Sequence, residues 1–371
     1  MKRLVLVGGG HAHVHVLKAL GETHDAGVAV ALVTPVARQV YSGMLPGYVA
    51  GHYSLAECGI DLEPLAHRAR AIVLRSPAVR IDSARREVVL ANGEAVAYDV
   101  LSLNVGSQPL VGDAAGVREH AIAVRPLERF VEGWERVLSL AKAGALNAIS
   151  VVGGGAAGVE LALAMQWRLR AEAASSAPHV RILTDAPSLL MEHPWPVRAR
   201  VEWMARRREI GVHTGCGVAE VGAGFVKQRQ PISFASDATF WVAGAAAHGF
   251  IRESGLQTDE RGFLAVNDFL QSVSHPEVFG AGDCATNLGH PRRKAGVFAV
   301  RAGPALAANL RAALAGAPLA RHATRNRFLA LLSCGDRYAI GTYGPLFFEG
   351  RWVWRWKDRI DRRFLARYAA R

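Results

Sequence analysis

Short apolar runs, separated by glycine-rich and polar segments, set the hydrophobic pattern of this chain. Residues 4–7, 28–33 and 148–152 are runs rich in valine, leucine and isoleucine. Such runs are typical of strands buried on both faces of a parallel sheet. The first and third runs lead at once into glycines and then into helical patterns. This order of elements predicts an α/β fold in which helices pack on parallel sheets.

The first glycine segment, Gly8-Gly-Gly10, stands between a strand and a helix that begins near His11. Glycines let backbone N–H groups approach a pyrophosphate, and the positive end of a helix dipole faces its charge. After an N-terminal strand, this pattern is typical of dinucleotide binding. Two positions depart from it. His13 stands where a third glycine permits close packing, and Thr34 stands where an acidic residue usually binds the ribose.

The same unit occurs a second time in the chain. Residues 148–170 repeat the strand, the glycine turn and the helix, and the turn from Gly153 to Gly158 has all three glycines. Each unit is also followed by the same closing strand. Residues 98–106 and 236–244 both contain an aspartate, an apolar run and then a glycine. The recurrence of both halves in the same order predicts two dinucleotide-binding domains in tandem.

A third strand that ends in a glycine-flanked aspartate occurs at residues 278–284, and a helix is predicted over 295–314. Asp283 could be a turn residue or a helix cap, which is the usual role of an aspartate in such a place. It could also accept hydrogen bonds from the ribityl hydroxyls of a flavin. The N-terminus of the following helix would then stabilise negative charge on the reduced flavin.

Two further segments predict local structure. Residues 41–52 contain three glycines and one proline, which predicts an irregular loop. The apolar side chains in this segment indicate that something covers it, and a bound ligand is one candidate. Residues 81–90 and 95–103 predict a hairpin with Asn92-Gly93 at its turn.

Composition narrows the class of protein. The 371 residues suggest two or three domains, and 50% of them are hydrophobic, as in ordinary globular proteins. No apolar run reaches the roughly 18 residues of a membrane-spanning helix, and the first strand at residue 4 leaves no room for a signal peptide. Four scattered cysteines without a CxxC pair suggest reduced thiols. We therefore expect a cytoplasmic protein.

The C-terminal segment is basic and amphipathic. The formal net charge of the chain is +12, which favours anionic partners, but there is no nucleic-acid-binding motif and we expect no such partner. From Arg351 to Arg371, eight basic residues stand against two acidic ones. Apolar residues recur every four positions at Trp356, Ile360, Phe364 and Tyr368. They predict a helix that lies on an anionic membrane surface with access to quinone, or that docks on the protein body or on a second subunit of a homodimer.

These motifs together resemble the pyridine nucleotide-disulfide oxidoreductase superfamily, whose members bind FAD and NAD(P)H. Type II NADH dehydrogenases and sulfide:quinone oxidoreductases look most similar, and residues 8–13, 41–47 and 294–303 resemble a subfamily often fused ahead of selenophosphate synthetase. The resemblance implies two tandem Rossmann-like domains with a small C-terminal subdomain. The implied boundaries are residues 1–112 and 246–322 for the FAD-binding domain, 113–245 for the NAD(P)-binding domain, and 323–371 for the C-terminal subdomain.

The resemblance also assigns residues to each nucleotide. FAD would contact Gly8, Gly10, His11, Thr34, Ser42, Gly43, Met44, Gly106, Gly282, Asp283, Gly296, Val297 and Phe298. NAD(P)H would contact Gly153, Gly155, Gly158, Asp185 and Gly244, with Glu160 near the nicotinamide as a catalytic residue. Asp185 favours NADH over NADPH, because a carboxylate accepts a hydrogen bond from the ribose 2′-hydroxyl and no arginine stands in that turn to bind a 2′-phosphate.

The implied function is transfer of a hydride from NAD(P)H to N5 of FAD, followed by electron transfer to a second acceptor, with a quinone as the first choice. Two other functions stay open, namely a flavoenzyme that acts on sulfur or selenium species and a flavin-binding sensor or assembly protein without turnover. The separated cysteines argue against a thiol mechanism. No metal site is expected from His11, His13 and His15, since only His11 and His15 share a helix face.

Overall fold

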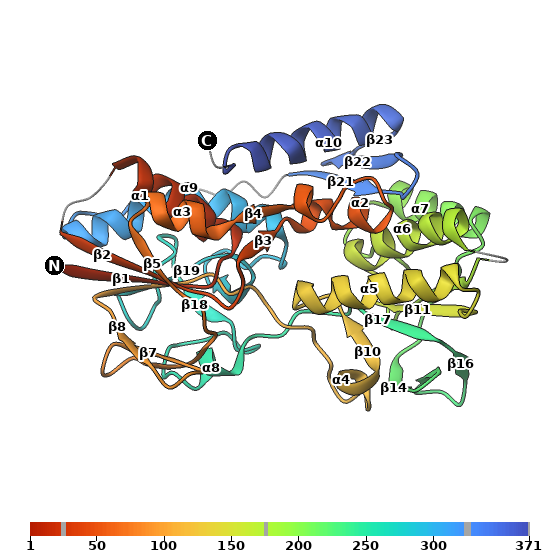
Figure 1. The fold of residues 1–371 in the computed structure, drawn as a ribbon, viewed down its shortest axis with the longest axis horizontal. Coiled ribbons are helices and arrows are strands. Elements are labelled where there is room, and N and C mark those ends of the chain that lie inside the picture. Colours follow the sequence, from red (N-terminus) through yellow and green to blue (C-terminus); the bar gives the residue numbers. More distant parts are fainter. Residues whose placement is uncertain (24–26, 174–176, 323–327, 370–371) are drawn as a thin grey trace.

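The first domain is built around a parallel sheet. The computed structural model describes residues 1–23, 27–173, 177–322 and 328–369 (Figure 1). The strand order of this sheet is β19-β9-β1-β2-β5, and every neighbouring pair is parallel. The strands are β1 (Lys2–Val7), β2 (Val28–Val33), β5 (Ala71–Leu74), β9 (Val100–Leu103) and β19 (Val278–Gly280).

Alternate residues of β1 enter two separate cores, because successive side chains of a strand point to opposite faces. Leu4 and Leu6 are buried against one layer, and Val5 and Val7 are buried against the other. The first layer consists of helices α1 (His11–Thr23), α3 (Leu62–Arg68) and α9 (Gly296–Ala315). The second consists mainly of β6 (Ala78–Asp82), β7 (Glu87–Leu90), β8 (Ala95–Ala97) and helix α8 (Gly249–Arg252).

The second domain repeats this architecture. Its parallel sheet has the order β10-β17-β11-β12-β13. The strands are β10 (Ala121–Ala123), β11 (Ala148–Val152), β12 (His179–Leu183), β13 (Gly211–His213) and β17 (Ala238–Trp241). One face carries α5 (Leu127–Lys142), α6 (Ala156–Glu172) and α7 (Trp195–Arg207), and the other carries β14 (Val218–Gly222), β15 (Phe225–Gln228) and β16 (Ser233–Ala235). The predicted α/β fold with two Rossmann-like units is confirmed.

The aspartate of each closing strand makes the same contact in both domains. Asp99 Oδ2 accepts a hydrogen bond from the backbone N–H of Arg3 at 2.7 Å, at the start of β1. Asp237 Oδ2 accepts one from the backbone N–H of Ala148 at 2.9 Å, at the start of β11. The strand that follows then pairs with that first strand, β9 with β1 and β17 with β11. The repeat in the sequence is therefore a repeat of topology and of local hydrogen bonding.

The structure corrects two predictions of local structure. Residues 42–49 are not an irregular loop but a 3-10 turn followed by the short helix α2 (Leu45–Val49), whose apolar side chains pack on the core of the second domain. Protein covers this segment, so a ligand is not needed to explain its apolar content. The hairpin around Asn92-Gly93 consists of β7 and β8 only. Residues 100–103 leave it and join the parallel sheet, where all four side chains are buried.

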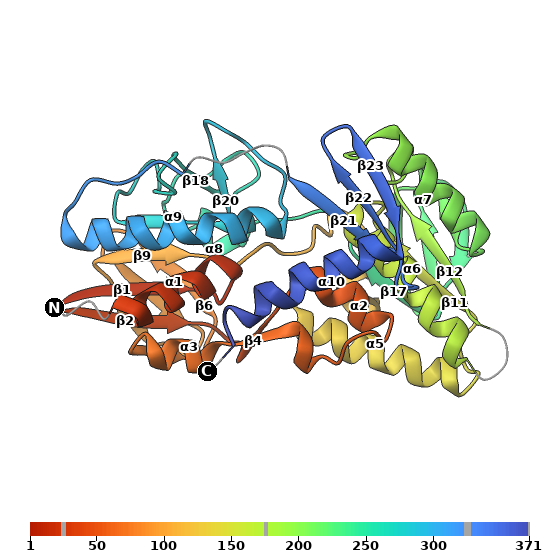
Figure 2. The same cartoon turned by 90° about the horizontal axis from the view of Figure 1, so that it is seen from above.

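The C-terminal part crosses the junction between the two domains. It consists of the antiparallel strands β21 (Leu329–Ser333), β22 (Ala339–Tyr343) and β23 (Leu346–Gly350), followed by helix α10 (Arg351–Ala366). Figure 2 shows α10 running from the three-stranded sheet toward α1 of the first domain. The remaining elements are β3 (Arg38–Val40), β4 (Gly59–Asp61), α4 (Val117–His120), β18 (Leu264–Val266), β20 (Ala285–Asn287) and two 3-10 turns, Ala56–Cys58 and Gly282–Cys284.

The helix is as predicted, but its apolar stripe is split. Phe364 and Tyr368 are buried, whereas Trp356 and Ile360 are 40% and 39% exposed. Residues four apart in an α-helix are offset by about 40° around its axis, so a row of four such residues drifts by about 120°. The buried face of α10 is instead formed by Val353, Lys357, Asp361 and Phe364.

Candidate functional site

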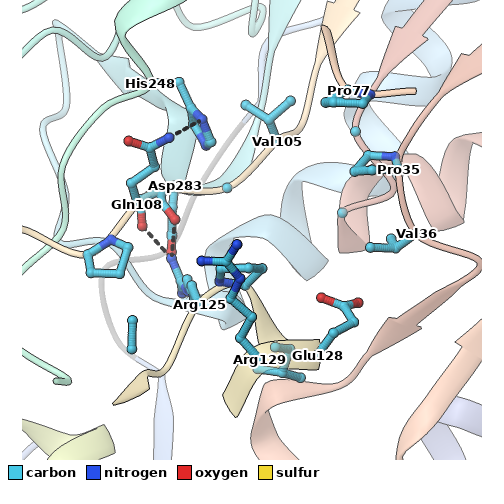
Figure 3. Close-up of a pocket in the computed structure, with 18 of the residues that line it drawn as sticks. Pro35, Val36, Pro77, Val105, Gln108, Arg125, Glu128, Arg129, His248 and Asp283 are labelled. Atoms are coloured by element: carbon cyan, nitrogen blue, oxygen red, sulfur yellow. Dashed lines mark hydrogen bonds and ion pairs between the residues drawn. The ribbon is translucent and has the colours of Figure 1, made fainter. Parts of the chain in front are cut away.

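A cavity of about 1240 Å³ lies between the two domains. Nine of the residues predicted to bind FAD line it. They are Gly8, Gly10, His11, Thr34, Ser42, Gly106, Gly282, Asp283 and Gly296. The wall that the second domain contributes comes mainly from β10, the first half of α5 and the segment that joins them, and it includes Arg125, Glu128 and Arg129 (Figure 3). The cavity is thus formed jointly by both Rossmann-like units.

The glycine turn of the first unit is pressed against Asn104. Gly8 has a φ of +93°, and a Cβ on it would lie 2.5 Å from the backbone oxygen of Asn104. A Cβ on Gly10 would lie 2.3 Å from Asn104 Oδ1. That side-chain oxygen accepts a hydrogen bond from the backbone N–H of Ala12 at 3.0 Å, and Asn104 Nδ2 donates to the carbonyl of Ala281 at 2.6 Å. Asn104 therefore holds the start of α1 next to the Gly282 turn.

The sequence motifs did not identify Asn104 as a site residue, although its position in the chain could have done so. It is the amide residue at the carboxyl end of the mainly apolar closing strand that the repeat identifies. In an open α/β sheet, ligands bind at the carboxyl ends of the strands. A buried amide in that position is therefore a candidate for organising the site.

His11 lines the cavity, and one nitrogen of its ring is buried without a partner among the described residues. The side chain is buried, and its Nε2 has no hydrogen-bond partner within the described ranges. Burial lowers the pKa of His11 to about 4, with Asp283 raising it and Arg125 lowering it further. The ring is neutral at pH 7, so one ring nitrogen can donate a hydrogen bond and the other can accept one. A buried ring nitrogen without a partner on the wall of a large cavity is what a polar ligand would satisfy.

Asp283 is joined to the second domain by Arg125. Arg125 Nη2 lies 3.1 Å from Asp283 Oδ2, and Arg125 Nη1 donates to the hydroxyl of Ser107. The Asp283 side chain is 10% exposed, so the pair is largely shielded on the carboxylate side. Beyond it, Gln108 Nε2 and His248 Nδ1 lie 3.1 Å apart on the same wall (Figure 3). Arg125, Gln108 and His248 belong to no motif, and only the fold brings them beside Asp283.

Four residues predicted to contact FAD do not line the cavity. Met44 is fully buried against Tyr53 and Cys58. The carbonyl of Gly43 accepts a hydrogen bond from Lys357 of α10. Val297 and Phe298 lie in the first turn of α9 behind Gly296, and the ring of Phe298 contacts that of Phe328 at 5.5 Å.

The second glycine turn lies at the reversal of strand order between β11 and β17. Gly153 has a φ of +129°, and a Cβ on Gly158 would lie 1.9 Å from the Gly153 oxygen. Gly155 has open space where a Cβ would be, and Gly244 follows β17 at the same edge. Nucleotides bind at such a point in open α/β sheets. After β12, Thr184 is buried and its hydroxyl accepts the N–H of Ala186, whereas Asp185 is exposed.

Glu160 lies on α6, outside the cavity lining, and contacts the C-terminal sheet. Its Oε1 accepts the backbone N–H of Ser333 at 2.7 Å. Burial raises the pKa of Glu160 to about 7, against the lowering effect of Lys357 and of the Ser333 hydrogen bond. The carboxyl therefore titrates near neutral pH at the place where α6, β21 and α10 meet.

The cysteines offer no reactive thiol pair. Cys58, Cys216, Cys284 and Cys334 are all buried and free. Burial raises the pKa of Cys58 to about 12 and those of Cys216 and Cys284 to about 11, and it raises that of Cys334 as well. A protonated buried thiol is a poor nucleophile. Within the described ranges there is also no group of three potential metal ligands, and no helix there is long and apolar enough to cross a membrane.

Comparison with known proteins gives a matching family and several relatives. The family model described as pyridine nucleotide-disulphide oxidoreductase matches residues 2–309. An NADH dehydrogenase-like protein of Mycobacterium tuberculosis is 26% identical over 297 residues, which cover 77% of this chain and 73% of the relative. A demethylphylloquinone reductase of Synechocystis sp. is 25% identical over 294 residues, covering 76% and 72% of the two chains.

Solved structures share the whole fold. The sulfide:quinone oxidoreductase of Aquifex aeolicus superposes with a TM-score of 0.82 at 16% identity, covering 99% of this chain and 91% of that one. NDH2 of Plasmodium falciparum, in complex with NADH, superposes with a TM-score of 0.81 at 13% identity, covering 100% and 99%. At these identities, the likeness establishes the fold alone.

The residues present fit FAD. The positive-φ glycine turn, the unsatisfied ring of His11 and the size of the cavity suit a dinucleotide. FAD is the cofactor and NAD(P)H the reductant, and the chain is an oxidoreductase. With the family model covering most of its length, the chain belongs to the pyridine nucleotide-disulphide oxidoreductase family.

Proposed function

We propose that this protein is an FAD-dependent NADH:quinone oxidoreductase that works at an anionic membrane surface. The observation that carries the proposal is the cavity formed jointly by both Rossmann-like units, with the Asp283–Arg125 pair on its wall. FAD, when bound, supplies the capacity to accept a hydride and pass on two electrons. The protein supplies the binding, the orientation and the charge around it.

Each unit would hold one nucleotide. The backbone at Gly8 and Gly10 and the ring of His11 would contact the FAD pyrophosphate, and Asp283, fixed by Arg125, would accept hydrogen bonds from the ribityl chain. The open side of Gly155 at the start of α6 would receive the pyrophosphate of NADH. The exposed carboxylate of Asp185 would accept from the ribose 2′-hydroxyl, which favours NADH over NADPH.

Two observations support a quinone as the electron acceptor, namely the absence of a reactive thiol among the four cysteines and the name of one relative. The four buried cysteines have raised pKa values and form no disulfide, so a dithiol acceptor or sulfur chemistry has no nucleophile among them. The Synechocystis relative is named as a reductase of demethylphylloquinone, which is a quinone. FAD can pass two electrons to a quinone directly, so this acceptor needs no reactive thiol in the protein.

The outer face of α10 supports a membrane location. This α10 face consists of Trp352, Trp356 and Ile360, which are 53%, 40% and 39% exposed, and the Trp352 and Trp356 rings stack at 6.3 Å. Exposed arginines flank it on the helix at positions 351, 355, 359 and 363. Aromatic side chains beside cationic ones suit the headgroup region of an anionic bilayer.

The apolar surface extends beyond the helix. Leu346 and Phe347 on β23 are 61% and 37% exposed. Arg200 of α7 pairs with Glu349 of β23 at 2.6 Å, and it stacks on the exposed ring of Trp203 at 4.1 Å. Exposed apolar side chains therefore also lie on β23, which contacts α10, and on α7, which meets β23 at this ion pair.

The first experiment is an anaerobic titration of the purified protein with NADH and then NADPH, followed by flavin absorbance. We expect bleaching at one equivalent of NADH, and recovery of the oxidised spectrum on adding a short-chain quinone. A yellow protein that stays oxidised with both nucleotides would contradict the dehydrogenase assignment and favour a sensor or assembly role.

The membrane location is tested separately by sedimentation with vesicles. The protein should bind vesicles rich in phosphatidylglycerol and not those of phosphatidylcholine alone. The double variant Trp352→Ser, Trp356→Ser should lose most of this binding. Ile72→Ser, which changes a side chain of β5 that is 68% exposed, is the matched control and should bind normally. Unchanged binding by the double variant, or a dimer that the two substitutions dissociate, would contradict the membrane role.

A further inference from the structure

The adenosine end of the FAD site has no carboxylate of its own. In the usual pattern an acidic residue at the end of the second strand binds the ribose hydroxyls. Here β2 ends at Thr34, whose hydroxyl accepts the backbone N–H of Val36 at 3.3 Å. The next two residues, Pro35 and Val36, have no polar side chain.

The polar residues that follow are already engaged within the first domain. The guanidinium of Arg38 forms two hydrogen bonds to Asp61, at 2.7 and 3.0 Å. The side-chain amide of Gln39 donates to the carbonyl of Val40 at 3.0 Å. The segment after β2 therefore offers the ribose no free carboxylate.

A carboxylate does face this place, from the other domain. Glu128 lies in the first turn of α5 and lines the cavity together with Thr34, Pro35 and Val36. Figure 3 shows its carboxyl group extending toward Val36 and Pro35 across the cavity. Within the described ranges the Glu128 carboxylate forms no ion pair and no hydrogen bond. An exposed carboxylate that points into a cofactor cavity is free to accept hydrogen bonds there.

The neighbours of Glu128 follow the order of the parts of FAD. In Figure 3, Pro35, Pro77 and Val36 stand at one end, followed by Glu128, Arg129, Arg125 with Asp283, and then Gln108 and His248. The dinucleotide has the order adenine, ribose, pyrophosphate, ribityl chain and flavin ring. Apolar side chains thus lie where the adenine is expected, the carboxylate where the ribose is expected, and a guanidinium where the pyrophosphate is expected.

We propose that Glu128 of the second domain supplies the carboxylate that binds the adenosine ribose of FAD. This assignment rests on FAD as the cofactor and adds a contact that the first domain lacks. It means that FAD joins the two domains at its adenosine end as well as at Asp283 and Arg125. Hydrogen bonds to a charged group are the stronger ones, so loss of this contact should weaken FAD binding about 10- to 100-fold.

The test measures FAD dissociation constants by flavin fluorescence on wild type, Glu128→Gln and Glu132→Gln. Glu132 lies one turn later in α5 and lines the same cavity. Its substitution by glutamine removes the same charge as Glu128→Gln. We expect Glu128→Gln to weaken FAD binding about 10- to 100-fold, and Glu132→Gln to change it less than about 2-fold. Far-UV circular dichroism confirms that both variants are folded.

An FAD analogue with 2′,3′-dideoxyadenosine in place of adenosine separates a ribose contact from a general charge effect. Wild type should lose about the same factor on this analogue, whereas Glu128→Gln should bind the analogue and FAD alike. Wild type that binds the analogue as tightly as FAD, or Glu128→Gln that binds FAD like wild type, overturns the proposal. Wild type that binds no FAD at all would instead refute the cofactor itself, so the two failures are distinct.

Discussion

The Nδ1 atom of His13 lies 2.6 Å from the carbonyl oxygen of Gly8, and its Nε2 lies 2.8 Å from the hydroxyl of Ser102. In the second unit the corresponding position is Gly158, where a Cβ would lie 1.9 Å from the Gly153 oxygen. The glycine of one unit allows direct contact between helix and turn. In the other unit the imidazole of His13 fills the gap and donates a hydrogen bond to the equivalent carbonyl, which explains the departure from the glycine pattern.

Replacing His13 with alanine should destabilise the first domain. The change removes two hydrogen bonds and leaves the Gly8 oxygen and the Ser102 hydroxyl without partners in a fully buried place. We expect the free energy of unfolding to fall by about 2–4 kcal/mol, measured by chemical denaturation. His15→Ala, at a half-buried position of the same helix, is the control and should cost less. An unchanged midpoint for His13→Ala would show that the two hydrogen bonds are dispensable.

Buried histidines should make the protein less stable in mild acid. Burial lowers the pKa of both His11 and His13 to about 4, below the unfolded value near 6.5. Between these values the unfolded chain binds protons that the folded chain does not, so the free energy of unfolding falls as the pH is lowered from about 6.5 to about 4. Denaturation at several pH values measures this slope. His13→Asn should reduce it, and a slope equal to that of wild type would contradict the assignment.

Glu160→Gln should stabilise the protein above neutral pH. The pKa of Glu160 is raised to about 7 from its ordinary value of 4.5, so the folded state binds a proton more tightly than the unfolded state does. The cost of the charged carboxylate therefore builds up as the pH rises from about 4.5 to about 7, and it is fully present above that pH. The substituted amide would be uncharged at every pH and would keep an oxygen for the Ser333 N–H. We expect a gain of about 1–2 kcal/mol at pH 8 and none at pH 5.

The control for this prediction is a carboxylate nearer the surface. Glu172→Gln changes a residue at the end of the same helix that pairs with Arg168 and Lys142, and it should show no gain at pH 8. If Glu160→Gln is equally stable relative to wild type at both pH values, Glu160 does not titrate near neutrality in the folded protein.

The docking of α10 should depend on a buried ion pair. Lys357 Nζ lies 2.6 Å from Asp361 Oδ2, with side chains 11% and 5% exposed, and Lys357 also donates to the Gly43 carbonyl. Removing one partner of a buried pair leaves an uncompensated charge. Lys357→Met should therefore weaken the docking of α10 by about 3 kcal/mol, seen as faster hydrogen exchange over residues 351–366. The double variant Lys357→Met, Asp361→Leu should recover much of the protection, and equal exchange in both variants would contradict this account.

Local patterns along the chain were enough to predict the two Rossmann-like units. Apolar runs, glycine turns and helical periods are local signals, because burial on both faces of a strand and the positive φ of Gly8 and Gly153 constrain nearby residues. The aspartates Asp99 and Asp237 repeat for the same reason, since each bonds the start of the first strand of its own unit. Much of the FAD cavity lining follows from these motifs.

The residues that lie across the cavity from those motifs could not be predicted from local patterns, because the packing of the two domains brings them there. The ion pair between Asp283 and Arg125, and the position of Glu128 opposite Val36, join residues from different domains and leave no pattern along the chain. Packing against residues distant in sequence also explains why only part of the predicted apolar stripe of α10 is buried. An amphipathic period shows that a helix has two faces, but the partners it finds decide which face is buried. Here Gly43 and Asp361 hold Lys357 inward, and Trp356 is left at the surface.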